Sequence, residues 1–430
     1  MQSTLAIALC SLLVLPGLAN SDDNLQQHED FAVGGAFFQQ PWVSAPASTT
    51  ARDGLGPLFK ANSCIACHVQ HGRGHPPLTA TEPFLSTIVK LSIPATTAEQ
   101  LMVAKTLGVA PEPIYGDHLQ PLGNKGLPGE ATPRFSYTEV HGQFADGETY
   151  TLQQPKLHLD SLNYGAMHPD VQHSVRVAPA LFGMGLLESI PAAEILANAD
   201  PDDKNDDGIS GKANQVWDIQ QQQIVLGRFS WKANQPSIAQ QSADAFRNDI
   251  GITNTRFPEQ PCTAAQTDCH HLPDGGKPEI PDDLLDKVVF HVNAQRVPPR
   301  REVTDPQVLQ GERLFKQSGC AACHIPTFPA LAAQAHQPYS DLLLHDMGAG
   351  LADHRPDFAA SGQEWRTPPL WGIGITAKLS GHTRFLHDGR ARNLLEAILW
   401  HGGEAEPAKQ NVLALNKPER EALLRFLNSL

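Results

Sequence analysis

Two short runs of the chain combine two cysteines and a histidine at the same spacing. Each reads Cys-x-x-Cys-His, and they occupy residues 64–68 and 320–324. Two thiols at this spacing can form thioether bonds to the vinyl groups of haem, and the histidine that follows can bind the haem iron. The sequence therefore predicts two covalently bound haem c groups. Their predicted attachment and ligand residues are Cys64, Cys67, His68, Cys320, Cys323 and His324.

Zinc sites and redox-active dithiols also use Cys-x-x-Cys. Neither alternative explains why a histidine follows the second cysteine in both runs. An apolar pair precedes each run, Leu58-Phe59 before the first and Leu314-Phe315 before the second. In both pairs the phenylalanine stands five residues before the first cysteine. We therefore expect each pair to belong to the first helix of a cytochrome c-like domain.

The N-terminus predicts export. Residues 4–18 form an apolar stretch too short to span a membrane, and a small residue, Ala19, precedes a polar segment. This pattern is typical of a signal peptide, here residues 1–19, and indicates a periplasmic protein. Cys10 lies inside the stretch, and we interpret it as signal sequence rather than as a lipid-anchored cysteine. No later segment has about 18 consecutive apolar residues, so we expect no membrane span.

Two cysteines remain in the mature chain, Cys262 and Cys269. An even pair close in sequence, in an oxidising compartment, predicts a disulfide that closes a local loop. Two free thiols that act as a redox dithiol are the alternative.

Composition limits the fold and the partners. The chain has 430 residues with 41% apolar content, enough for more than one core. It has 35 prolines and 34 glycines, which predicts a large share of loop. The net charge of −14 argues against binding to nucleic acid or to an anionic membrane, and it is compatible with a basic partner protein.

We expect a mainly α fold with two cytochrome c-like haem domains, the first enlarged by long loops and short β-hairpins. Helices are expected at about 305–317 and 418–427, where Asn416 can cap the second one. The predicted segments are an N-terminal extension (20–45), a first haem domain (46–250), a connecting segment with the Cys262/Cys269 loop (251–300) and a second haem domain (301–430).

An internal repeat relates the two halves. Residues 179–185 read Pro-Ala-Leu-Phe-Gly-Met-Gly, and residues 368–374 read Pro-Pro-Leu-Trp-Gly-Ile-Gly. Arg176 precedes the first segment and Arg366 the second. We expect each arginine to pair with a haem propionate, because a buried carboxylate needs a charged partner that donates hydrogen bonds. A solvent-exposed arginine is the alternative.

Several segments together carry a resemblance to a known family. They are residues 64–74, 185–188, 207–211, 226–229, 344–348, 385–390 and 395–404. On these segments the chain resembles the di-haem oxidoreductase family, which is related to bacterial di-haem cytochrome c peroxidases and to the di-haem enzyme that matures methylamine dehydrogenase. The resemblance covers nearly the whole mature chain. It implies a haem-dependent oxidoreductase that reduces hydrogen peroxide with electrons from a small cytochrome or cupredoxin.

Residues 385–404 are the most specific part of the resemblance. In the better-known peroxidases a similar His-Asp-Gly and Leu-Glu-x-Ala segment is followed by a methionine that binds the second haem iron. The matching position here is His401. The resemblance therefore implies an iron bound by His324 and His401, at a lower potential than a histidine–methionine pair gives. We interpret His345 and Met347 as packing around this haem.

Peroxide reduction requires two electrons and an iron with an accessible sixth position. If His401 closes the second iron, the first haem is the catalytic one and the second is an electron relay. Met184 matches Ile373 in the repeat, which cannot bind iron, so we interpret Met184 as a packing residue. A nearby acid or base must move a proton between the peroxide oxygens, and Glu188 is the predicted group. The other candidates are His71, His75 and His168.

Oxygen ligands alternate in the segment Asp203, Asn205 and Asp207, before Gly208. This spacing is similar to the start of a calcium loop and predicts a calcium ion there. A plain acidic turn is the alternative, because Asn214 stands where such a loop has its glutamate.

Two other functions remain open at this stage. One is an electron-transfer cytochrome with two saturated irons, and the other is a haem enzyme that oxidises a protein side chain. The large first domain favours an enzyme over a relay. Trp371 and Trp400 are candidates for aromatic side chains between the irons.

Overall fold

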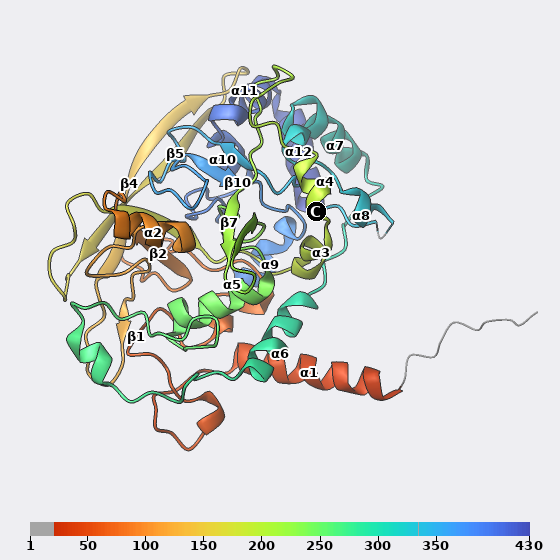
Figure 1. Ribbon diagram of the computed structural model, residues 1–430. Coiled ribbons are helices and arrows are strands. Elements are labelled where there is room, and N and C mark those ends of the chain that lie inside the picture. The colour runs from red at the N-terminus through yellow and green to blue at the C-terminus, as the bar shows by residue number, and fades with distance from the viewer. Residues whose placement is uncertain (1–20, 334) are drawn as a thin grey trace, which may run out of the picture.

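The computed structural model describes residues 21–333 and 335–430 (Figure 1). The predicted signal peptide, residues 1–19, and Cys10 lie outside the described residues. Within these residues the chain forms 12 α-helices and five antiparallel sheets of two strands each. None of the described helices is both long enough and apolar enough to cross a membrane.

Six helices lie in the first half of the chain, which ends with Asn293 of α6, and six lie in the second half, which begins with Pro306 of α7. Those of the first half are α1 (Ser21–Gln39), α2 (Ala98–Leu107), α3 (Met184–Ser189), α4 (Ala192–Leu196), α5 (Ile238–Ala245) and α6 (Asp282–Asn293). Those of the second half are α7 (Pro306–Gln317), α8 (Pro329–Ala332), α9 (Thr376–Ser380), α10 (Leu394–Leu399), α11 (Glu406–Ala414) and α12 (Lys417–Ser429).

The strands pair two by two. The pairs are β1 (Leu58–Phe59) with β3 (Leu122–Gly123), β2 (Thr87–Ser92) with β6 (Gln172–Val177), β4 (Thr132–Gln143) with β5 (Thr149–Asp160), β7 (Gln215–Asp218) with β8 (Gln223–Leu226), and β9 (Leu344–Asp346) with β10 (Glu364–Arg366). Helices make up 33% of the chain and strands 17%, so the predicted mainly α class is wrong and the fold is mixed. The physical reason is that long segments expected as loops satisfy their backbone groups by pairing with each other.

Capping residues in the sequence correctly predicted where α7 and α12, the first and last helices of the second half, begin. The carboxylate of Asp305 accepts hydrogen bonds from the first amides of α7, and Pro306 occupies its first turn. Asn416 and Glu419 form a capping box at the start of α12. Both helices begin within one residue of the expected position, which confirms this part of the prediction.

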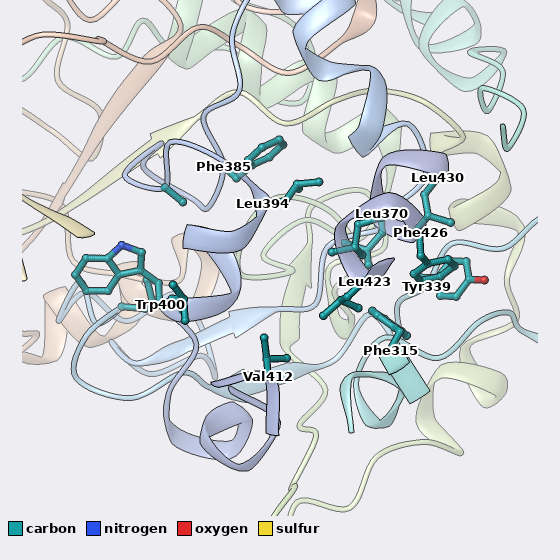
Figure 2. Close-up of a cluster of buried hydrophobic side chains, with 14 of the residues drawn as sticks. Phe315, Tyr339, Leu370, Phe385, Leu394, Trp400, Val412, Leu423, Phe426 and Leu430 are labelled. Carbon is teal, nitrogen blue, oxygen red and sulfur yellow. The ribbon is translucent and has the colours of Figure 1, made fainter. Parts of the chain in front are cut away.

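The buried core of the second half joins α7 and α12 and extends to α10 and α11 (Figure 2). The ring of Phe315 from α7 lies 5.3 Å from that of Phe426 in α12, and Tyr339 lies 5.6 Å from Phe426. Full burial of one such side chain contributes about 1.5–3 kcal/mol. This core therefore fixes the helix that leads into the second Cys-x-x-Cys-His run.

The first half has an equivalent helix pair, because α1 packs against α6 as α7 packs against α12 (Figure 1). The ring of Phe38 in α1 lies 6.4 Å from that of His68, and Phe315 in α7 lies 6.2 Å from His324. These helices come from the stretches predicted as N-terminal extension and connecting segment. The domain boundaries themselves stay predictions.

The expected helix directly before Cys64 is absent from the described fold. Leu58 and Phe59 instead form strand β1, which pairs with β3. Gly54, Gly56 and Pro57 precede this strand, and both residue types disfavour a helix interior. Phe38, rather than Phe59, is the counterpart of Phe315.

The insertion in the first half forms one long hairpin, β4 and β5, with 12 paired residues in each strand. It runs along one side of the molecule toward α11 (Figure 1). At its tip Arg420 of α12 lies 2.8 Å from Asp146 and 2.5 Å from Glu148, and it stacks 4.0 Å over the ring of Phe144. The hairpin therefore ties the first half to the last helix.

The two repeat segments pack against each other. Gly183 and Gly372 both have a positive φ, 67° and 74°. A Cβ on Gly183 would overlap Trp371, and a Cβ on Gly372 would lie 3.0 Å from Phe182. Phe182 and Trp371 occupy equivalent repeat positions, so each half covers the glycine of the other. The halves thus meet face to face at the repeat.

Cys262 and Cys269 are joined by a disulfide. Between them Gln266 is fully buried and donates a hydrogen bond to Glu130, and the Thr263 hydroxyl donates to the Ile114 carbonyl at 2.7 Å. The loop therefore packs on the strand-rich insertion of the first half.

Candidate haem-binding sites

Each Cys-x-x-Cys-His run lines a cavity. The second-run cavity, lined by Cys320, Cys323, His324 and His401 among others, measures about 530 Å³, within the range of about 300–1,000 Å³ typical of ligand pockets. The first-run cavity, lined by Cys64, Cys67 and His68, measures about 160 Å³, so a haem there would displace side chains of its lining. Four residues line both cavities, which therefore adjoin. They are Pro179, Met184, Ser230 and Trp231.

The histidine of each run is held by one ring nitrogen. Nδ1 of His68 lies 2.9 Å from the Pro179 carbonyl oxygen, and Nδ1 of His324 lies 2.8 Å from that of Tyr339. A ring N–H donated to a carbonyl leaves the lone pair of Nε2 for a metal, which is the usual arrangement of iron and zinc ligands. Burial lowers the pKa of both rings to about 4, so both are neutral at physiological pH.

Three of the four thiols lie in surroundings that favour the neutral form. Burial raises the pKa of Cys64, Cys67 and Cys320 to about 12. They are therefore protonated when neither haem nor metal is bound. Protonated thiols in an apolar cavity fit the formation of thioether bonds.

One group of potential metal ligands occurs among the described residues, Cys323, Asp341 and His345, whose ligand atoms lie within 4.8 Å of one another. Nδ1 of His345 lies 2.7 Å from Glu404, and Nε2 lies 2.8 Å from Asp341. Burial alone would lower the pKa of His345, but hydrogen bonds to Asp341, Cys323 and Glu404 raise it to about 12. The resulting imidazolium has no lone pair for a metal.

His401 shares the second-run cavity with His324. It follows α10, and its Nδ1 lies 2.7 Å from the Ala397 carbonyl oxygen, so Nε2 keeps its lone pair. Burial lowers its pKa. A positive charge on His401 would also lower the pKa of His324, so the two rings are within electrostatic reach of each other.

Each cavity also holds a buried arginine with an unused donor. Nε of Arg366 donates to the Ser230 carbonyl at 2.8 Å in the second-run cavity, and Arg176 donates to Asp357 at 2.8 Å in the first-run cavity. Nη1 of Arg366 and Nη2 of Arg176 find no hydrogen-bond partner in the described part of the chain. An unpaired buried donor costs about 1–3 kcal/mol, so the second-run cavity favours a carboxylate such as a haem propionate beside Arg366. Arg176 already pairs with Asp357 and lies 3.9 Å from Asp353. The residues present thus fit haem in the second-run cavity, and those of the first-run cavity fit it once side chains of the lining move.

The family follows from a comparison with known families. A family model described as "Di-haem oxidoreductase, putative peroxidase" matches residues 141–430. The chain belongs to the di-haem oxidoreductase family. Membership implies haem cofactors and supports a haem-dependent oxidoreductase. No curated protein matches the chain. A solved structure of hydrazine synthase from Kuenenia stuttgartiensis, pressurized with xenon, is similar at 12% identity and a TM-score of 0.34, over 91% of this chain and 100% of that one.

In this member of the di-haem oxidoreductase family, Glu188 lies outside the lining of both cavities. Its carboxylate accepts hydrogen bonds from the Ile238 amide at 2.8 Å and from Asn293 at 3.3 Å, which joins α3 to α5 and α6. Its position therefore gives no support to the predicted catalytic role. The other three candidates also lie outside both linings; they are His71, His75 and His168.

Polar residues that sequence analysis missed line the first-run cavity. They are Lys90, His118, Asp244 and Asp249. Nδ1 of His118 lies 3.1 Å from Asp117. Burial raises the pKa of Asp244 and of Asp249 and lowers that of Lys90. No motif marks these positions, since tertiary packing alone brings β2, the His118 loop and α5 together.

The side chain of Trp231 lies where the two cavities meet. It lines both of them, and its Nε1 donates to the Val177 carbonyl at 2.7 Å. Trp371 lines only the second-run cavity, and Trp400 lines neither. The tryptophans chosen from sequence were therefore not the one that separates the sites.

The predicted calcium residues lie in a loop held by hydrogen bonds within the chain. Asp203 accepts from the Asp207 amide at 3.1 Å, and Asp207 accepts from the Ile209 amide at 2.9 Å. Asn205 donates to Asp207 at 3.1 Å. These bonds are those of an acidic turn, and calcium binding stays a prediction.

Proposed function

We propose that the chain is an exported di-haem c-type cytochrome oxidoreductase that reduces hydrogen peroxide with electrons from a small redox protein, a cytochrome or cupredoxin. The observation that carries the proposal is the difference between the cavities. The second-run cavity presents two histidines, His324 and His401, each held through Nδ1 by a backbone carbonyl. The first-run cavity presents one such histidine, His68, together with buried acid/base groups.

In this proposal the four cysteines of the two runs hold haem c by thioether bonds, and the haem irons, when bound, supply the redox chemistry. His324 and His401 bind the second iron, and His68 binds the first. Residence in the periplasm and a calcium ion in the 203–207 loop belong to the same proposal.

Peroxide reduction consumes two protons and two electrons for each peroxide and yields two water molecules. His118 is suited to hold a proton in the first-run cavity, because Asp117 at 3.1 Å orients its ring. Asp244 and Asp249 suit the same task, since burial raises the pKa of each carboxyl group and so favours its protonated form. Lys90 and Arg176 add positive charge beside these groups.

The test is the spin state of each iron by electron paramagnetic resonance, with peroxide turnover measured on the same sample. We expect one low-spin haem, one haem with an accessible position, and oxidation of a reduced cytochrome by peroxide. His118→Gln should lower turnover about 100- to 10,000-fold and leave both haems attached. His168→Gln is the matched control outside the cavities. Six-coordinate irons in every redox state, with no reaction, would contradict the proposal.

A pure electron relay is the second candidate, and one observation favours it. Met184 lines the first-run cavity, so a thioether lies on the same cavity as His68. A methionine bound there would saturate the first iron. Met184→Leu distinguishes the two functions: it leaves the spin state of a peroxidase unchanged, whereas in a relay it converts a low-spin haem to high-spin.

A further inference from the structure

Two guanidinium groups lie in the second-run cavity without an ion-pair partner. Arg73 and Arg366 both line it, and among the described residues no carboxylate lies within 4.0 Å of either. The acidic groups that attract them electrostatically are Asp388 for Arg73 and Asp341 for Arg366, and both are already engaged in other ion pairs. Asp388 lies 2.8 Å from Arg390, and Asp341 lies 2.8 Å from His345. Two positive charges that lack an ion pair on one cavity favour an anion there.

Arg73 comes from the other half of the molecule. It stands five residues after His68, in the loop that follows the first run, yet it lines the cavity of the second run and not its own. Its Nη2 donates to the Leu386 carbonyl, and its guanidinium lies 5.2 Å from the ring centre of Trp231. These contacts place the group at the border between the two cavities.

Three polar atoms on this lining are buried and find no hydrogen-bond partner in the residues that the structure describes. They are Nε of Arg73, Nη1 of Arg366 and Oγ of Ser380. Buried donors are nearly always paired in folded proteins. Their common position on one cavity indicates a ligand that accepts several hydrogen bonds and carries negative charge.

We propose that Arg73 binds a propionate of the haem carried by the second run, so that the loop following His68 holds the cofactor of the other half. Arg366 binds the second propionate, and the two positive charges match the two carboxylates. This inference rests on haem at residues 320–324, which is part of the proposed function, and it does not depend on peroxidase activity.

The assignment has an electrostatic consequence for the second haem. A guanidinium beside a propionate offsets negative charge near the iron, and this favours the reduced state. Removal of the charge therefore favours the oxidised state and lowers the reduction potential. The first haem lies in the adjoining cavity, which Arg73 does not line, so its potential should change less than that of the second haem.

The experiment is a redox titration of Arg73→Gln, with the low-spin second haem and the first haem followed separately by paramagnetic resonance. We expect the ratio of oxidised to reduced second haem at a given applied potential to rise about tenfold. This corresponds to a fall of about 59 mV in its reduction potential for a one-electron couple. Arg73→Lys keeps the charge and should restore most of the potential. Arg384→Gln is the matched control, because it removes an arginine of the same half-buried kind that lines neither cavity.

The haem content of each protein separates the outcomes. Selective loss of the second haem in Arg73→Gln also supports the assignment. A first haem shifted as much as the second or more, no shift at all, a Lys variant as shifted as the Gln variant, or loss of both haems overturns it. One haem in the unmodified protein overturns the proposed function together with this inference, whereas two haems with unshifted potentials overturn the inference alone.

Discussion

His345 and His401 lie on the same cavity, but their ring partners give them opposite chemistry. His401 uses only Nδ1, on a backbone carbonyl, and keeps a lone pair on Nε2. Both ring nitrogens of His345 form hydrogen bonds to carboxylates, those of Asp341 and Glu404, so its ring is a cation. Sequence resemblance pointed to His401, but it could not have excluded His345, because Glu404 approaches it from a segment about 60 residues further along the chain.

His401→Ala should convert the second haem from low-spin to high-spin, because the iron loses its Nε2 ligand. Both haems should stay attached, because the cysteines of both runs are unchanged. Electron paramagnetic resonance of the oxidised protein measures the change. His345→Gln is the control, since its ring has no free lone pair and the low-spin signal should persist. An unchanged spectrum in His401→Ala would remove this residue as the ligand.

Glu404 predicts an acid-sensitive part of the stability. Burial would raise its pKa, but hydrogen bonds from His345 and Ser210 hold it at about 2. A carboxyl group whose pKa is lowered on folding stabilises the fold above its ordinary value near 4.5, and this contribution is lost as the pH falls toward 2. The melting temperature should therefore fall between about pH 4.5 and 2 in the native protein.

Glu404→Gln isolates this contribution. The variant should melt at a lower temperature than the native protein at pH 7, and the difference should shrink as the pH approaches 2. Glu406→Gln is the control, because its side chain is partly exposed and pairs with Lys409. A constant difference at every pH would contradict the role of the Glu404 charge.

At the scale of elements, local signals predicted some helices and missed others. The caps of α7 and α12 lie within the helices' own sequence, in Asp305 and Asn416, and both helices were predicted correctly. The helix partner of His68 was missed, because Phe38 precedes the first run by more than 20 residues and a strand intervenes. The fold class was wrong for a related reason, since the partner strands β2 and β6 are far apart in sequence.

The long hairpin gives a prediction about stability. Arg420→Ala removes the ion pairs with Asp146 and Glu148 and the stacking on Phe144. The ion pairs are partly exposed and contribute little, but the Arg420 side chain is buried against Phe144, so we expect the free energy of unfolding in urea to fall by about 1–3 kcal/mol. Arg425→Ala is the control on the same helix, where an exposed pair with Glu302 should change it by less than about 0.5 kcal/mol. Equal effects would mean that the hairpin tip does not stabilise α12.

At the scale of the molecule, the repeat predicted two related halves but not how they meet. Gly183 and Gly372 admit the aromatic side chain of the opposite half, and the two cavities adjoin at Trp231. The predicted haem attachment residues were chosen from sequence, because thioether attachment requires a fixed local spacing. The acid/base groups of the first-run cavity were not, because His118 and Asp244 are brought together only by folding.

Adjoining but distinct cavities predict that the two haems attach independently. The native protein should show two covalent haems per chain, measured by haem staining after denaturing electrophoresis and by the pyridine haemochrome spectrum.

The double variant Cys64→Ala/Cys67→Ala should retain one covalent haem with the low-spin signal of the His324 and His401 pair. Cys320→Ala/Cys323→Ala should retain one haem without it. The control Cys262→Ala/Cys269→Ala should retain both, since its disulfide lies outside the two linings. Zinc in place of haem, or loss of both haems from either haem-site variant, would contradict independent attachment.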